Sequence, residues 1–482
     1  MLNYKIIIKT LGALLLIEAF FLLFSFFVAW GYGGDDYKAF AITTLITLLV
    51  GILLLVFTRN ADKAIYKREA YIIVSLVWVV FSLFGALPFV LSGYIPSYTD
   101  AFFETISGFT TTGASILNDI ESLPHGLLFW RSLTQWLGGM GIIVLSLALL
   151  PIFGIGGMQL FAAEVPGPTA DKIHPRVTET AKRLWGIYIL FTATEAILLF
   201  AGGMTFFDAI NHAFTTMATG GYSTKQASIA YWNSPFIQYV IIIFMFLAGT
   251  NFSVSYWALS GKFKKAFSNE EFKYYLGFTL FFTFAIMFML LGSEEISGEK
   301  AFRDSLFQVV SIMTTTGYAT ADYWQWVHHI GVFIFIIMFF GGSAGSTGGG
   351  IKIARIVILL KNLYLEFKRL IHPNAIIPVR LNGKAVEASV VRNVLAFILF
   401  YLVIFFVSTL IMTFTGLDIV SAMGAVIASL GNIGPGIGSV GPAENFSHIS
   451  VFGKWFLSFL MLIGRLELFT VLILFSPSFW RK

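Results

Sequence analysis

Long apolar segments separated by short polar ones follow each other along almost the whole chain. Ten of them are long enough to cross the roughly 30 Å hydrocarbon core of a bilayer as helices. The expected spans cover residues 10–30, 39–58, 71–92, 126–151, 184–203, 235–260, 273–292, 328–360, 389–414 and 449–475. Four other apolar segments, near 100–110, 206–218, 301–314 and 418–430, are too short to span. The pattern predicts an all-α polytopic membrane protein.

Composition supports a membrane protein and excludes several other classes. Of the 482 residues, 57% are hydrophobic and 12% are charged, about half the charged fraction of a soluble domain. The absence of cysteine excludes disulfides, thiolate metal sites and cysteine nucleophiles. The net charge of +5 is no sign of nucleic-acid binding here, because the position of the basic residues matters more than their sum. No paired carboxylates or nucleophile–base arrangement stands out, so we do not expect an enzyme.

A short polar turn follows each of the four short apolar segments. The turns read Thr-Thr-Thr-Gly at 110–113 and 314–317, Met-Ala-Thr-Gly at 217–220 and Gly-Asn-Ile-Gly at 431–434. Each turn precedes a long apolar segment, which indicates four copies of one unit: spanning helix, short re-entrant helix, turn, spanning helix. Each short helix begins near an aspartate that we expect to act as its N-cap. These aspartates are Asp100, Asp208, Asp304 and Asp418.

The distribution of lysine and arginine gives the expected topology. If the N-terminus is inside and the short segments return without crossing, 24 of the 31 basic residues lie on the cytoplasmic side. Both termini are then cytoplasmic, and the four units are parallel repeats in pseudo-fourfold arrangement around an axis along the membrane normal. The expected division is an accessory helix pair (1–70) and pore repeats one (71–183), two (184–272), three (273–388) and four (389–482).

The four turns have the chemistry of a cation filter. A helix of ~10 residues rises ~15 Å, so each turn would lie about halfway into the bilayer. The C-terminal ends of the short helices carry partial negative charge, which favours a cation. Glycine at the end of each turn permits positive φ, so that carbonyl oxygens can form a ring that replaces the water shell of an ion. A single such turn could simply end a buried helix, but four equivalent copies favour a filter.

These turns resemble the filter loops of the Trk/Ktr/HKT superfamily of potassium transporters, and the resemblance covers essentially the whole chain. The two helices before the repeats make the Trk-type members the nearest match. The resemblance implies one filter glycine per repeat and a transported potassium ion bound in the filter, with no organic cofactor. In plant relatives, serine at the first filter glycine accompanies sodium transport, so Gly113 favours potassium. The implied ion-binding residues are Thr110, Thr111, Thr112, Gly113, Ala218, Thr219, Gly220, Thr315, Thr316, Gly317, Asn432, Ile433 and Gly434.

The threonine pattern is broken in the second and fourth turns, at Ala218-Thr219 and Asn432-Ile433. The filter is therefore expected to be chemically asymmetric and less selective than a strictly fourfold one. Two charged residues fall within apolar segments of the same repeat, Glu104 and Arg131, and they could be partners.

A glycine-rich stretch at 341–350 interrupts the second spanning segment of the third repeat. Six glycines in ten residues make a regular helix unlikely to persist, because each costs ~1 kcal/mol relative to alanine. The stretch looks like the intramembrane gating loop of the family; the alternative is a small-residue helix-packing patch. The predicted gate residues, the last of them from repeat four, are Gly341, Gly342, Ser343, Gly345, Ser346, Thr347, Gly348, Gly349, Gly350 and Arg465.

Arg465 lies ~15 Å from the cytoplasmic end of its predicted helix. A charge at that depth is costly unless it is paired or faces a cavity. It matches the pore-facing arginine of the family, which implies an electrostatic barrier below the filter. The alternatives are snorkelling or an ion pair, for which Glu467 is poorly placed because i and i+2 do not share a helix face.

Together these features predict potassium uptake across the cell (inner) membrane through a channel-like pore, gated by the loop and by a cytoplasmic subunit. A sodium- or proton-coupled symporter on the same scaffold is the alternative, and a membrane enzyme or receptor with a central cavity is the rival from another class. By resemblance, the partners are a second copy of the chain and a ring of RCK-type nucleotide-binding subunits such as TrkA. The basic segment 352–392 is a plausible docking surface for that ring.

Overall fold

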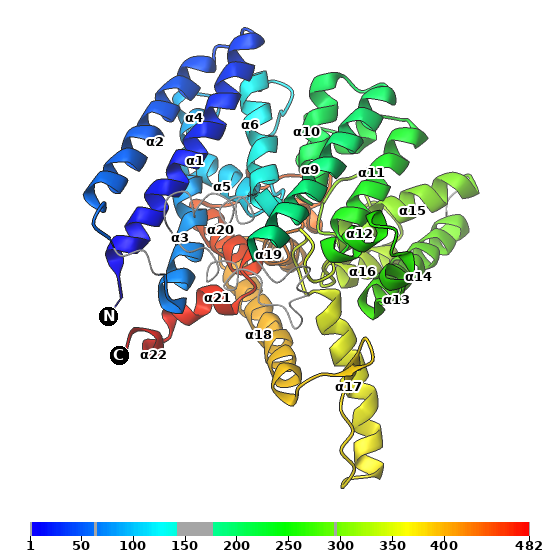
Figure 1. Cartoon of the computed structure of the whole chain (residues 1–482). Helices are drawn as coiled ribbons and strands as arrows, with labels where there is room; N and C mark the ends of the chain where they lie inside the picture. Colours follow the sequence, from blue (N-terminus) through cyan, green and yellow to red (C-terminus); the bar gives the residue numbers. More distant parts are fainter. Residues whose placement is uncertain (1, 62–64, 142–176, 294–295, 482) are drawn as a thin grey trace.

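The computed structural model describes residues 2–61, 65–141, 177–293 and 296–481, and helices dominate it (Figure 1). Within these residues, six helical segments are long and apolar enough to cross a membrane. They are α1 (Tyr4–Gly31), α2 (Tyr37–Phe57), α3 (Lys67–Gly85) continued by α4 (Leu87–Leu91), α9 (Val177–Ala201), α14 (Glu270–Ser293) and α18 (Ala388–Thr413). The expected polytopic membrane protein is therefore confirmed in its helical and apolar character.

Two further spans are helix pairs that bend sharply. The pair α11 (Pro235–Ala248) and α12 (Phe252–Leu259) bends by 110°, as does the pair α20 (Val451–Arg465) and α21 (Phe469–Leu472) with η4 (Ile473–Phe475). The expectation of uninterrupted spans over 235–260 and 449–475 is therefore wrong. The first bend falls at Gly-Thr-Asn (249–251), and the second contains two residues with positive φ, Glu467 and Leu468.

The other two spans expected as second helices are also interrupted in the described residues. Helix α6 (His125–Trp136) passes into η1 (Leu137–Gly141), where Gly139 leaves helical geometry at ψ −105°. Residues 142–151 of this expected span lie outside the described part of the chain. Helices α16 (His328–Ile337) and α17 (Ile353–Ile371) are separated by the glycine-rich stretch, which contains no α-helix. The break predicted in repeat three is confirmed, and the helix-packing alternative, which requires a helix there, is excluded.

The four predicted short helices are present as α5 (Tyr98–Phe109), α10 (Phe206–Met217), α15 (Gly298–Met313) and α19 (Ile419–Leu430). Beyond their first turns, most side chains of these helices are buried, which places protein around their C-terminal parts. The C-terminal ends of the four helices therefore lie inside the fold.

The capping of these short helices differs from the prediction in three of four cases. Asp418 is the N-cap of α19 and accepts hydrogen bonds from the amides of Val420 and Ser421, both at 3.1 Å. The caps of α5, α10 and α15 are instead hydroxyl residues, namely Ser97, Thr205 and Ser297. Asp100 and Asp208 follow three residues after their caps, which is the spacing of a capping box, and Asp304 lies inside α15 because that helix begins earlier. The carboxylates at 100 and 208 still lie in the positive first turn.

The accessory pair α1 and α2 packs closely along its length and lies against the first repeat (Figure 1). Gly12 and Gly51 permit the approach, because a Cβ on either would come within 3 Å of a leucine side chain on the other helix. On the opposite side of the molecule, α17 projects away from the helical bundle, followed by a small antiparallel hairpin (Figure 1). The remaining elements are η2 (Ser228–Tyr231), α13 (Phe263–Ser268), β1 (Arg380–Leu381), β2 (Lys384–Ala385), η3 (Gly438–Val440) and α22 (Pro477–Trp480).

Candidate functional site

The four polar turns have the same backbone. Each short helix ends at a C-cap, and the next residue adopts a left-handed conformation with φ between 53° and 59°. Those residues are Thr111, Thr219, Thr315 and Asn432. Such a conformation costs on the order of 1–3 kcal/mol for a residue other than glycine and is typical of functional sites. Its occurrence at four equivalent positions, three of them β-branched, indicates that the surrounding fold imposes one specific geometry on every turn.

A glycine with positive φ follows two residues later in each turn. These glycines are Gly113 (84°), Gly221 (76°), Gly317 (81°) and Gly434 (100°). A Cβ atom built on each would overlap a carbonyl oxygen of the next turn: Gly220 for the first, Thr316 for the second, Ile433 for the third and Thr112 for the fourth. The contacts run from turn one to two, three, four and back to one. The four turns therefore meet in a closed cycle that only glycine permits.

The second turn is offset by one residue from the alignment expected from sequence. Helix α10 ends at its C-cap Ala218, so Thr219 takes the place of Thr111 and Gly220 takes the place of Thr112. The backbone thus matches Gly221, rather than Gly220, with Gly113. Two adjacent glycines made the two alignments indistinguishable in sequence, and the position of the helix end decides between them.

The side chains of the turns are less alike than their backbones. Thr110 and Thr112 are joined through their hydroxyls at 2.8 Å, and Thr314 and Thr316 are joined in the same way at 2.8 Å. The corresponding positions of turns two and four carry Ala218 and Gly431, which have no hydroxyl. In turn four, Asn432 instead donates from Nδ2 to Thr112 Oγ1 at 2.9 Å and to the carbonyl of Met461 at 2.9 Å.

A buried polar network connects turns one and two. Glu104 and Arg131 form the predicted ion pair, with Nε and Oε1 2.6 Å apart and both side chains buried. Arg131 also donates to the carbonyl of Ser223 at 2.8 Å, and its guanidinium lies 3.7 Å from the ring centre of Tyr222. Removing one partner of a buried pair of this kind leaves an unpaired buried charge and lowers the free energy of unfolding by about 3–5 kcal/mol.

Sequence reasoning did not identify Gln135. This buried residue of α6 donates from Nε2 to the carbonyl of Gly220 at 2.7 Å and accepts from the amide of Tyr222 at 3.0 Å. A glutamine amide can satisfy a backbone donor and acceptor at once. Gln135 therefore holds turn two in place from repeat one. In the sequence it is one of several polar residues near the end of this segment, and nothing distinguishes it from Ser132 and Thr134.

Two helix breaks lie directly against the ends of the short helices. A Cβ atom on Gly138, in repeat one, would overlap the carbonyl oxygen of Phe109, the last residue of α5. Likewise, a Cβ on Gly464, in repeat four, would overlap the carbonyl oxygen of Leu430, the last residue of α19. The breaks and the turns are therefore adjacent layers of the same repeats.

Arg465 connects these layers. Its Nη1 donates to Thr111 Oγ1 at 3.1 Å and to the carbonyl of Thr347 at 2.7 Å. Its Nη2 donates to the carbonyls of Gly138 and Gly139, each at 2.7 Å. One guanidinium from repeat four thus binds the turn and helix break of repeat one and the glycine-rich loop of repeat three.

The glycine-rich loop packs into the same region. The Ser343 amide donates to the carbonyl of Gly249 at 2.8 Å, and the Thr347 hydroxyl donates to the carbonyl of Met217 at 3.1 Å. The amide of Gly349 donates to Thr315 Oγ1 at 2.7 Å, which attaches the loop to the third turn. The loop therefore contacts repeats two and three, and through Arg465 it also contacts repeat four.

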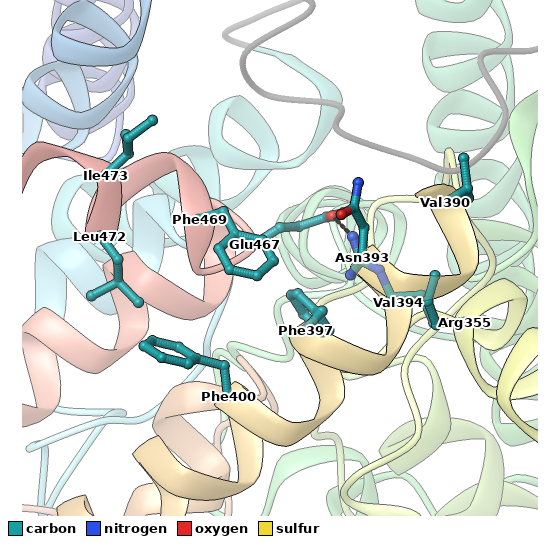
Figure 2. Close-up of a pocket in the computed structure, with 10 residues that line it drawn as sticks. All are labelled: Arg355, Val390, Asn393, Val394, Phe397, Phe400, Glu467, Phe469, Leu472 and Ile473. Carbon is teal, nitrogen blue, oxygen red and sulfur yellow. Dashed lines mark hydrogen bonds and ion pairs between the residues drawn. The ribbon is translucent and has the colours of Figure 1, made fainter. Parts of the chain in front are cut away.

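The end of the loop is joined to the bend of repeat four by a second charged contact. Arg355, in the first turn of α17, pairs with Glu467 (Figure 2). Its guanidinium also lies 3.8 Å from the ring centre of Phe397 on α18. The pair borders a cavity of about 670 Å³ whose other walls are mostly apolar side chains of α18 and α21 (Figure 2). Glu467 is thus engaged with Arg355 across two repeats.

Comparisons with known proteins agree over the full length of the chain. A family model described as TrkH, cation transport protein, matches residues 36–297 and 294–482. The chain is 42% identical to the Trk system potassium uptake protein TrkH of Salmonella typhimurium and 34% identical to TrkG of Escherichia coli, covering 100% of this chain in both cases and 100% and 99% of those proteins. The crystal structure of the potassium transporter TrkH from Vibrio parahaemolyticus matches with a TM-score of 0.90 and 38% identity, covering 100% of both chains. The chain belongs to the TrkH family of cation transport proteins.

Proposed function

We propose that this protein takes up potassium through a pore whose selectivity filter is the closed cycle of four turns. The relatives are named as potassium uptake proteins and are transporters rather than enzymes. The observation that carries the proposal is the repetition of one strained backbone geometry in four turns, each contacting the next through a glycine. The filter residues are those expected from sequence, with Gly221 added as the fourth glycine of the cycle.

The physical basis of selectivity is the replacement of water by carbonyl oxygens. In extended backbone with negative φ, successive carbonyls point to opposite sides; positive φ at two positions of each turn can direct them to the same side, toward a common axis. Four short helices end at the turns, and their C-terminal ends add partial negative charge toward the same centre. Potassium is the transported substrate in this arrangement, and the unequal side chains of turns two and four make the four walls of the filter chemically different.

The glycine-rich loop and Arg465 form the gate in this proposal. Both lie against the turns, through the contacts of Gly349 with Thr315 and of Arg465 with Thr111. A guanidinium at that position repels a cation passing the filter, and a glycine-rich loop outside any α-helix can move aside when its contacts with the other repeats break. The four carbonyl and hydroxyl acceptors around Arg465 stabilise its charge at membrane depth.

The remaining sequence expectations complete the proposal. The chain consists of an accessory pair and four repeats with the expected boundaries, has both termini in the cytoplasm and forms a homodimer in the cell membrane. An RCK-type regulatory ring binds the cytoplasmic side, where the projecting helix α17 with Lys361, Lys368 and Arg369 is a surface suited to it.

Ion flux from the purified protein in liposomes tests the proposal. Potassium, rubidium and sodium uptake are measured in parallel, with empty liposomes as the control, and potassium is expected to exceed sodium. A reversal potential that follows the potassium gradient alone supports a channel, whereas one that shifts with an imposed sodium or proton gradient supports the symporter. If no potassium flux occurs with or without the regulatory subunit, the proposed function is wrong.

A further inference from the structure

The glycine-rich loop has two parts that are held in different ways. We call residues 341–344 and 351–354 the base of the loop and residues 345–350 its crown. In the base, the amide of Gly341 donates to the carbonyl of Ile351 at 2.9 Å, and the amide of Ile353 donates to the carbonyl of Gly342 at 3.2 Å. These two hydrogen bonds pair the arms of the loop with each other. These bonds close the base of the loop, and Phe340 and Ile351 at its margin form a parallel bridge.

Glu271 adds a third connection between the two arms. This residue lies in the first turn of α14, the first helix of the same repeat, and is 5% exposed. Its Oε1 accepts hydrogen bonds from the amide of Ala344 at 2.6 Å and from the amide of Ala354 at 3.1 Å. One carboxylate oxygen thus binds both arms, although the two donors are ten residues apart in sequence.

The contact with Ala354 also caps a helix. The N-cap residue of α17 is Lys352, whose side chain provides no cap hydrogen bond. The amides in the first turn of a helix need an acceptor from elsewhere, and an anion is favoured there by the helix dipole. Glu271 supplies that acceptor from another helix. Both alanines are buried, so loss of the carboxylate would leave two buried amides without this acceptor.

The crown is attached mainly to other repeats and to the turns, whereas one hydrogen bond of the base leaves repeat three, from the amide of Ser343 to the carbonyl of Gly249. Thr347 contacts Met217 of repeat two, Gly349 contacts Thr315 of the third turn, and Arg465 of repeat four binds the carbonyl of Thr347. A loop that clears the pathway must break these contacts. The contacts of the base made by Gly341, Ile353 and Glu271 remain within repeat three and can survive the movement.

We propose that Glu271 is a positioning residue for the gate: its carboxylate keeps the base of the loop closed, so that the crown moves as one unit hinged on α14 and α17. The inference rests on the proposed function of the loop as the gate. Opening then requires only the crown contacts to break, and a displacement of the cytoplasmic end of α14 is transmitted directly to the loop.

Variants of Glu271 separate this role from charge alone. Glu271→Gln keeps an oxygen that can accept both amides, so we expect its open probability to stay within about twofold of wild type. Glu271→Ala removes the acceptor. Glu271→Asp shortens the side chain by one methylene, so the carboxylate no longer reaches both amides. Both variants should raise the open probability several-fold in bilayer recordings without changing the single-channel conductance. The matched control is Glu270→Ala, because Glu270 pairs with Lys361 at a partly exposed position next to Glu271.

A labelling experiment reports on the loop itself. The chain has no cysteine, so Ser346→Cys introduces one thiol in the crown. The thiol labelling rate should rise several-fold in the Glu271→Ala and Glu271→Asp backgrounds and stay unchanged in the Glu271→Gln and Glu270→Ala backgrounds. If Glu271→Ala folds poorly, Glu271→Asp still provides the test.

Two outcomes would overturn the inference, and they differ from failure of the gate itself. Glu271→Gln behaving like Glu271→Ala would mean that charge, not the hydrogen-bonded base, is what matters. If Glu271→Ala and Glu271→Asp both gate and label as wild type does, Glu271 does not position the gate. This conclusion requires that deletion of residues 345–349 still alters flux. If that deletion leaves flux and its regulation intact, the proposed gate is wrong instead.

Discussion

The four turns and the four adjacent helix breaks belong to the same repeats, yet the turns are nearly equal and the breaks are all different. Every turn has the same pair of positive-φ residues and the same glycine contact with its neighbour. The breaks consist of a glycine pair in repeat one, a Gly-Thr-Asn bend in repeat two, a ten-residue loop in repeat three and a bend with Arg465 and Glu467 in repeat four. Similar sequence units thus produce one symmetric and one asymmetric layer.

The difference follows from what each layer has to do in the proposed pore. An ion on an axis is best coordinated by equivalent groups from all sides, so the backbone of the turns is kept equal even where their side chains diverge. A gate needs a part that moves against parts that stay, and four equal breaks would offer none. The two layers are joined by side chains at the left-handed positions, since Thr111 binds Arg465 and Thr315 binds Gly349.

The largest effect is expected from disturbing the symmetric layer at Gly221. Gly221→Ala forces alanine to φ near 76°, at a cost of about 1–3 kcal/mol, and places a Cβ on the carbonyl oxygen of Thr316. Potassium flux in liposomes should fall by about tenfold or more, the equivalent of ~1.4 kcal/mol. Gly220→Ala is the matched comparison, because its Cβ meets the side chain of Gln135 rather than backbone and should be tolerated better. If Gly220→Ala lowered potassium flux more than Gly221→Ala did, Gly220 would be the filter glycine, as expected from sequence.

A smaller effect of opposite sign is expected from the asymmetric layer at Arg465. Arg465→Gln removes the positive charge beside Thr111 and should raise potassium flux several-fold. Arg465→Lys keeps the charge but loses the planar fork that reaches four acceptors, so flux should stay low while the loop is held less firmly. Lys38→Gln, at an exposed position on the accessory helix α2, is the control and should leave flux unchanged. Unchanged flux in Arg465→Gln would count against the barrier.

The smallest effect is expected from the connection between the layers. Thr315→Val removes the acceptor of the Gly349 amide, a hydrogen bond with a net contribution of about 0.5–1.5 kcal/mol, and should raise the open probability a few-fold. Thr219→Val is the matched control at the equivalent position of turn two, because its hydroxyl bonds to the neighbouring carbonyl of Ala218 and, within the described residues, makes no contact with the loop. Bilayer recordings at a fixed potassium gradient measure both variants. Equal effects would mean that the valine disturbs the turn itself and not its contact with the loop.

Features that depend on local sequence were predictable. Hydropathy located the apolar segments, six of which form continuous helices long enough to span within the described residues, since the cost of an exposed polar backbone in lipid favours a long apolar helix. The repeated turns showed the four short helices, and the density of glycine showed the break in repeat three. The Glu104–Arg131 pair followed from the high cost of an isolated charge in an apolar segment.

Features that depend on contacts between distant segments were not predictable. The bends in repeats two and four fall at short, ordinary sequences such as Gly-Thr-Asn, and only the tertiary structure shows that each helix pair bends by 110° there. Gln135 and Glu271 each stand among other polar residues of their helices, and only packing shows that they bind backbone of turn two and of the glycine-rich loop.

The sequence by itself therefore determined the class of the protein, the location of its apolar segments and, to within one residue, the positions of its four turns, because these follow from hydropathy and local backbone preference. Only the tertiary structure decided which glycine of the second turn closes the cycle, how each second helix breaks and what holds the loop at its base. Those outcomes depend on the residue at which a helix ends and on which backbone carbonyl the following residues contact. A displacement of one residue, as between Gly220 and Gly221, changes every such contact without changing the local pattern.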